Sequence, residues 1–150
     1  MRAVEAFKLV PRAPAGCGES DLWRGDRCVV EGLAGTALEA QYEVDDGGPA
    51  FVLLTSYDLP FEETLHAFLL DEEGRVVESA KLGAPYAPGV LENVHVDDEW
   101  PNTLAFDFQG PVLLTVHDFP RGALHRRLEI ARPEDRPVSS RPPPSVRRPS

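Results

Sequence analysis

Apolar and polar side chains alternate with a period of two through the middle of this chain. Every second position from 37 to 44 is apolar and the positions between are polar: Leu38, Ala40, Tyr42 and Val44 against Glu39, Gln41 and Glu43. That period is typical of a β-strand with one buried face. Two aspartates and two glycines follow at 45–48, a composition that favours a tight turn.

Further short apolar runs follow at similar spacing and predict more strands. Each is bounded by Gly, Pro, Asp or Asn residues, which punctuate β-structure. The expected strands are 37–44, 51–57, 65–71, 75–82, 90–97, 103–109, 112–118 and 124–131, with weaker candidates at 4–10 and 28–33. The sequence therefore predicts an all-β fold: a small, mainly antiparallel β-sandwich of about eight to ten short strands, with a β-barrel as the structural alternative.

One stretch also fits a helix. Asp58 is a good N-cap, Pro60 follows early, and acidic residues occupy the next positions, as helix starts prefer. The run after it reads as a closed hairpin around 71–74. We therefore expect at most one short helix near 59–65, followed by a strand.

The register of the last strands can be predicted from their apolar positions. A three-residue loop at 109–111 would pair Phe108 with Val112, and Leu104 with Val116. That pairing turns the apolar side chains of both strands to the core, whereas a shift by one residue would turn them outward. Val94 and Val96 of the preceding strand are expected to face the same core. The pairing would also place Asp97 and His117 in one row on the outer face.

Charge is unevenly distributed over the 150 residues, which have a formal net charge of −10. Residues 31–118 hold 18 acidic residues against two basic ones. Nucleic acid is therefore not an expected partner, because binding to it depends on cationic side chains. No apolar run reaches the roughly 18–20 residues that span a bilayer, so no membrane association is expected. An acidic face suits a basic protein partner or the chain's own basic C-terminal tail.

The end of the chain differs from the rest. Residues 132–150 hold six prolines, five arginines and four serines. Such a segment has too few apolar side chains to offset the entropy of ordering. We therefore expect one β-rich domain at 1–131 and a disordered, basic, Pro-rich tail at 132–150.

The first residues carry charges where a secretion signal requires an apolar stretch. The expected compartment is therefore the cytoplasm. Because that compartment is reducing, Cys17 and Cys28 are expected to be free thiols; the alternative is a Cys17–Cys28 bridge in an oxidising compartment. The sequence leaves the oligomeric state open.

Aromatic side chains among charges mark candidate binding surfaces. Trp100 directly follows the acidic residues Asp97, Asp98 and Glu99 in an expected loop. Trp23 lies in a polar stretch, and Tyr86 lies between two prolines. Exposed aromatic anchors with a charged rim are typical of protein interfaces. In the alternative interpretation, both indoles fold back and cover the ends of the sandwich.

The chain contains no nucleophile elbow, no Gly-rich phosphate loop and no HExxH sequence. No cofactor is therefore expected, and a non-catalytic, protein-binding role is favoured, as an inhibitor, an immunity-type protein or an adaptor. The alternative is a metal-binding protein or metal-dependent enzyme that holds a divalent metal ion on the sheet. Its candidate ligands are His95, Asp97 and His117. Acidic turns also leave calcium as a weaker metal candidate.

Overall fold

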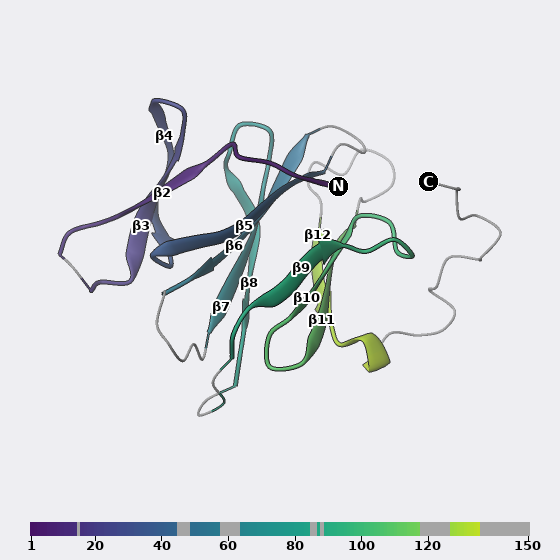
Figure 1. Ribbon diagram of the computed structural model, residues 1–150. Coiled ribbons are helices and arrows are strands. Elements are labelled where there is room, and N and C mark those ends of the chain that lie inside the picture. Colours follow the sequence, from purple (N-terminus) through teal and green to yellow (C-terminus); the bar gives the residue numbers. More distant parts are fainter. Residues whose placement is uncertain are drawn as a thin grey trace.

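A computed structural model describes residues 1–14, 16–44, 49–57, 64–84, 87, 89–117 and 127–135. These residues form twelve strands and one turn of 3-10 helix (Figure 1). The elements are β1 (Arg2–Ala3), β2 (Lys8–Pro11), β3 (Glu19–Arg24), β4 (Arg27–Ala34), β5 (Ala37–Val44), β6 (Ala50–Ser56), β7 (Leu65–Leu70), β8 (Val76–Leu82), β9 (Glu92–Val96), β10 (Thr103–Asp107), β11 (Pro111–His117), β12 (Arg127–Ala131) and η1 (Pro133–Asp135).

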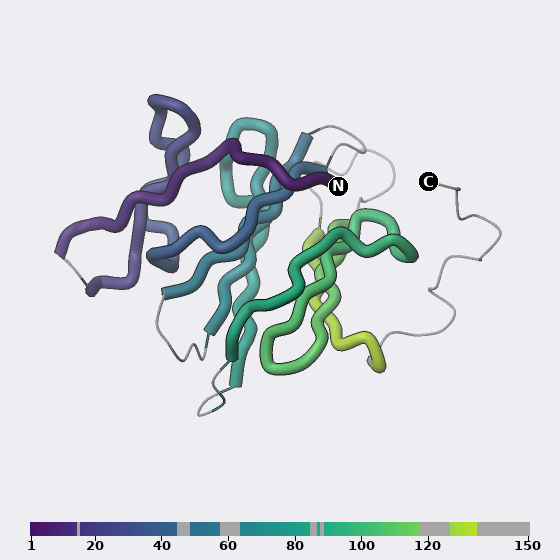
Figure 2. Tube along the Cα trace, viewed as in Figure 1, coloured from purple at the N-terminus to yellow at the C-terminus, as the bar shows by residue number. Residues whose placement is uncertain are grey.

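The strands form three antiparallel sheets. The central sheet has the order β1-β5-β6-β7-β8, the C-terminal sheet β12-β11-β10-β9, and the N-terminal sheet β2-β3-β4. Apart from β1, each sheet is one continuous part of the chain, as the colours of Figure 2 show. The predicted all-β, antiparallel fold is confirmed, and the sheets do not close into a barrel.

The central sheet is buried on both faces. Leu54 and its alternate neighbours in β6 pack into a core shared with the C-terminal sheet. Leu53 and the other alternate positions pack into a second core with Phe7, Leu22 and Leu33 of the N-terminal part. All seven residues of β6 are buried for this reason. The architecture is thus a sandwich with a third layer, which the sequence did not predict.

A β-bulge in β5 places its first residues on other faces than expected. Leu38 pairs with Thr55, but Ala40 pairs with Leu54, so Glu39 is an extra residue in the ladder. Ala40 therefore faces the core with the C-terminal sheet, whereas Leu38 packs against the other core. The prediction that Leu38 shares a face with Ala40, Tyr42 and Val44 was wrong because a simple alternation cannot show a bulge.

In β10 and β11, the predicted side chains face the core, but the two strands pair in a register shifted by two residues from the predicted one. Asp107 pairs with Pro111 and Leu104 with Leu114, so the connection is 108–110. An even shift keeps every side chain on its face. The core positions Leu104, Phe106, Phe108, Val112, Leu114 and Val116 are accordingly all buried. Val94 packs against the same core as expected, but the expectation was wrong for Val96, which is 37% exposed on the edge strand β9.

Elsewhere the expected elements differ in detail. Strand β3 was not predicted, and the expected strand at 4–10 is divided into β1 and β2. The expected helix near 59–65 falls mostly outside the described residues, while Leu65 already belongs to β7. Cys17 and Cys28 are free thiols. Within the described ranges, no helix has the length and apolar character to cross a membrane.

Ordered structure extends past the predicted domain boundary at 131. The Arg132 guanidinium donates hydrogen bonds to the carbonyl oxygens of Phe108, Gly110 and Pro111, at 2.9 to 3.2 Å. η1 follows and lies against β11. The rest of the predicted tail lies outside the described residues.

Candidate binding groove

The two long sides of the sandwich between the central and C-terminal sheets differ. On one side, edge strands β8 and β12 are in contact, and the backbone N–H of Leu128 donates a 2.6 Å hydrogen bond to the carboxylate of Glu78. On the other side, β5 and β9 leave a groove between the sheets. Its walls come from β1, β5 and β9: Ala3, Val4, Leu38, Glu39, Ala40, Gln41, Tyr42 and Val94.

The groove is small. Its volume is about 270 Å³, below the roughly 300–1,000 Å³ of small-molecule pockets. Ala3 and Ala40 contribute short side chains, and Tyr42 and Val94 also pack against the core between the sheets. Burial raises the pKa of the Tyr42 phenol, which is therefore neutral over the physiological range. The space suits apolar side chains of a larger partner better than a whole ligand.

Local hydrogen bonds hold the β5 wall of the groove. The side-chain oxygen of Gln41 accepts hydrogen bonds from the N–H groups of Ala6 and Phe7, and its amide nitrogen donates to the carbonyl of Phe7. Arg2 forms an ion pair with Glu43 at 2.8 Å. These contacts hold the N-terminal segment along β5, so Ala3 and Val4 have fixed positions in the wall.

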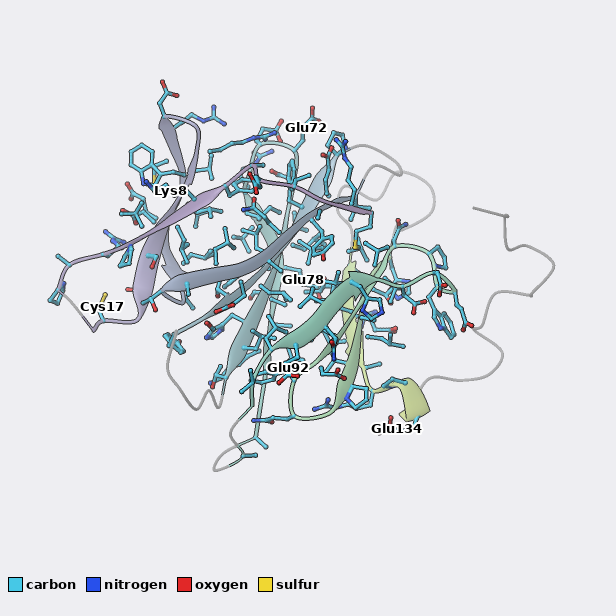
Figure 3. The ribbon with its side chains drawn as sticks, viewed as in Figure 1. Lys8, Cys17, Glu72, Glu78, Glu92 and Glu134 are labelled. Carbon is cyan, nitrogen blue, oxygen red and sulfur yellow. The ribbon has the colours of Figure 1, made fainter. Side chains whose placement is uncertain are left out.

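The opposite wall is β9, an edge strand of the C-terminal sheet. Its residues alternate: Val94 lines the groove, His95 is exposed on the outer face opposite Ala105, and Val96 is 37% exposed. The strand starts with a register irregularity, where Asn93 has a φ of 56° and its amide donates to the Asp107 carboxylate at 2.7 Å. Figure 3 labels Glu92 at this end of the strand. Glu92 pairs with Asp107 across the ladder, so two carboxylates share this end.

The loop at 97–100 does not present an aromatic anchor. The Asp97 carboxylate accepts hydrogen bonds from the N–H groups of Glu99 and Trp100, at 3.0 and 2.7 Å, and so closes the turn. Trp100 is only 9% exposed. The expectation that Trp100 is exposed was wrong, and the alternative, in which its indole folds back, describes this residue. Asp98 and Glu99 remain exposed.

The other expected binding residues lie elsewhere. Trp23 is partly exposed on β3, where it pairs with Lys8 and Cys28 in the N-terminal sheet. That sheet lies across the central sheet from β9 and the 97–100 loop (Figure 1). Tyr86 lies outside the described residues. Trp23 and the 97–100 loop therefore do not belong to one surface.

The candidate metal ligands are also separated. His95 lies on β9, where it pairs with Ala105. His117 lies on β11, two strands away from β9, and pairs with Arg127. His117 instead lies 3.4 Å from the carboxylate of Glu129. Asp97 is in the row of Thr103, but the observed register places Thr115 and not His117 next in that row. Within the described parts of the chain, no three His, Cys, Asp or Glu residues are grouped to hold a metal ion.

Sequence reasoning missed the groove residues Ala40, Tyr42 and Val94. Their alternation was recognised, but it predicts only that a side chain faces inward. An inward side chain at the edge of a sheet can still be open to solvent, because no further strand covers it. Which strands are edges depends on long-range pairing, which the local sequence does not show. The only local sign of this groove in the sequence was the group of acidic residues near Val94.

No protein-family model matches this chain. Searches of curated proteins and of solved structures likewise give no match.

Proposed function

We propose that this chain is a non-catalytic protein-binding domain that engages a basic partner at the side of the sandwich bounded by β5 and β9. The observation that carries the proposal is the groove itself: an opening lined by both apolar and polar side chains, beside an exposed sheet edge with two carboxylates at one end. Apolar contact surrounded by charge is the usual composition of a specific protein interface.

The charge of the surface indicates the charge of the partner. Glu39 lines the groove, and Glu92 is exposed at the start of β9. Within the described residues, Glu92 forms no ion pair with a basic side chain. Lysine or arginine side chains of a partner would reduce the repulsion between Glu92 and Asp107, since like charges directly opposite in a ladder are destabilising.

Site-specific crosslinking tests the proposal. A photoreactive amino acid replaces Val96 on β9 or, as a matched control, Val76 on β8; both are exposed valines on edge strands, at 37% and 40%. Irradiation of the cells that produce the protein should give a discrete adduct from position 96 and none from position 76. When an extract of unirradiated cells is irradiated instead, added salt should reduce the yield of this adduct, because screening weakens exposed charge contacts. No adduct at 96, or equal adducts at both positions, would contradict the proposal.

A further inference from the structure

The free edge of β9 offers unpaired backbone groups. Asp97 donates its N–H to the carbonyl of Thr103, and the ladder continues with His95 opposite Ala105. In an antiparallel pair, backbone groups of successive residues point alternately to the partner strand and away from it. The N–H and C=O groups of Val94 and Val96 therefore point away from β10, toward the side where the C-terminal sheet ends.

The other sheet edges in the described structure are covered, short or irregular. β4, an eight-residue edge strand, has two register irregularities against β3, with Gly32 at a φ of 77°. At β12, the Leu128 N–H is bonded to Glu78, and β8 lies alongside. β1 has only two residues, and β2 ends at Pro11, which has no N–H. Protection of this kind is how native sheets avoid pairing with other chains. β9 has such protection only at its start, where Asn93 interrupts the register.

From these observations we infer that the partner segment is an extended strand that adds to the C-terminal sheet beside β9. Addition of a strand to an exposed edge obtains affinity from backbone hydrogen bonds and specificity from alternate side chains. Side chains on the inner face would enter the groove beside Val94 and Tyr42. Those on the outer face would lie near Glu92 and the exposed acids at 98–99. The segment is thus one in which apolar and basic residues alternate.

A second copy of this chain is the other candidate occupant of the edge. Pairing of two β9 edges would bring together two chains that each have a formal charge of −10. Charge complementarity therefore favours a basic segment. This inference depends on the proposed function, but its test uses a different measurement.

The probe is a fluorescent peptide of alternating lysine and valine, titrated against the full chain and followed by anisotropy. Val96→Pro removes a single N–H at the free edge, a position where proline is tolerated in sheets. Val96→Thr retains both the N–H and a β-branched side chain, so it is the matched control. Val96→Pro should weaken peptide binding about tenfold, the effect of losing a hydrogen bond and leaving its acceptor unpaired. Val96→Thr should bind like the unaltered chain.

A second peptide has the same sequence but carries N-methyl groups at alternate residues, so its charge is unchanged while its hydrogen-bonding edge is blocked. It should lose binding to the unaltered chain, and this comparison remains valid even if Val96→Pro fails to fold. Equal binding of the two peptides, or binding unaffected by Val96→Pro, would overturn strand addition but leave crosslinking at Val96 possible. A dimer that dissociates on Val96→Pro substitution, observed by sedimentation, would overturn the basic partner and assign the edge to a second copy.

Discussion

The side chain of Gln41 supplies the hydrogen bonds that a neighbouring strand would otherwise make with the backbone at residues 6 and 7. Its amide forms three hydrogen bonds with the backbone of Ala6 and Phe7, where the segment between β1 and β2 leaves the sheet. The sequence presented Gln41 only as a polar position in an alternating run. Residue polarity was therefore predicted correctly, but its role was not, because the partners are more than thirty residues away in sequence. Long-range pairing of this kind leaves no local pattern.

Trp100 gives the residue-scale prediction. Since its indole is 9% exposed, Trp100→Ala should lower the free energy of unfolding by about 3–5 kcal/mol, the usual cost of deleting a large buried aromatic side chain. Urea unfolding measures this directly. Trp23→Ala is the control, because Trp23 is partly exposed on the N-terminal sheet, and its effect should be clearly smaller. An unchanged midpoint for Trp100→Ala would show that the indole is not buried in solution.

At the scale of elements, the β7–β8 hairpin is the part that the sequence predicted best. The run 71–74 has the composition of a tight turn, and the observed strands start and end within about a residue of the expected ones. Asp71 closes this turn, since its carboxylate accepts hydrogen bonds from the N–H groups of Glu73 and Arg75 and pairs with the Arg75 guanidinium at 2.9 Å. Local chemistry determines this element, so local sequence was enough.

The same hairpin leads to a prediction about pH. Partial burial raises the pKa of Asp71, but the hydrogen bonds and positive charge of Arg75 outweigh this and hold the pKa below its usual value. Because the folded pKa is lowered, the stabilisation from this contact is complete above the unfolded pKa of about 3.9. It is lost as the pH falls toward the folded pKa. Carbon-detected NMR titration should show Asp71 titrating below the usual range.

Arg75→Gln is the control for that titration. It removes the charge and the guanidinium hydrogen bond but leaves the backbone N–H of residue 75, so the Asp71 pKa should rise from its lowered value. Titration of Asp71 at or above its usual pKa in the unaltered chain would contradict the observed contact.

The elements that were predicted less well depend on their neighbours. Strand β3 was missed because Glu19 and Asp21 occupy its outer face and Arg24 is at an inner position, although Leu22 at its centre is fully buried. The bulge at Glu39 and the two-residue shift at 108–110 depend on the partner strands. The inward faces of the last meander were nevertheless predicted, because the apolar pattern fixes the parity of a register even where it does not fix its exact value.

For the whole molecule, the decisive feature is that one sheet serves two cores. Adjacent residues of β6 point in opposite directions, Leu53 to the core with the N-terminal sheet and Leu54 to the core with the C-terminal sheet. The apolar faces of both outer sheets are covered by the central one. We therefore expect the three sheets to unfold together.

Two substitutions test this coupling. Leu53→Ala and Leu54→Ala should each destabilise the chain by about 2–5 kcal/mol, the range for a fully buried leucine. Each should shift one common transition, as two-state unfolding requires. Tryptophan emission can follow the two sides separately, with Trp23 replaced by Phe in one series and Trp100 in the other. If Leu53→Ala moved only the signal of Trp23, the N-terminal sheet would be an independent unit.

The burial of β6 on both faces has a consequence for the unfolded chain. Ala50–Ser56 contains no charged residue, no glycine and no proline, and it is rich in apolar side chains. Such segments are prone to form cross-β aggregates when they are exposed. In the native sheet, β5 and β7 occupy both edges of this strand, so aggregation through this segment is governed by how often the molecule opens.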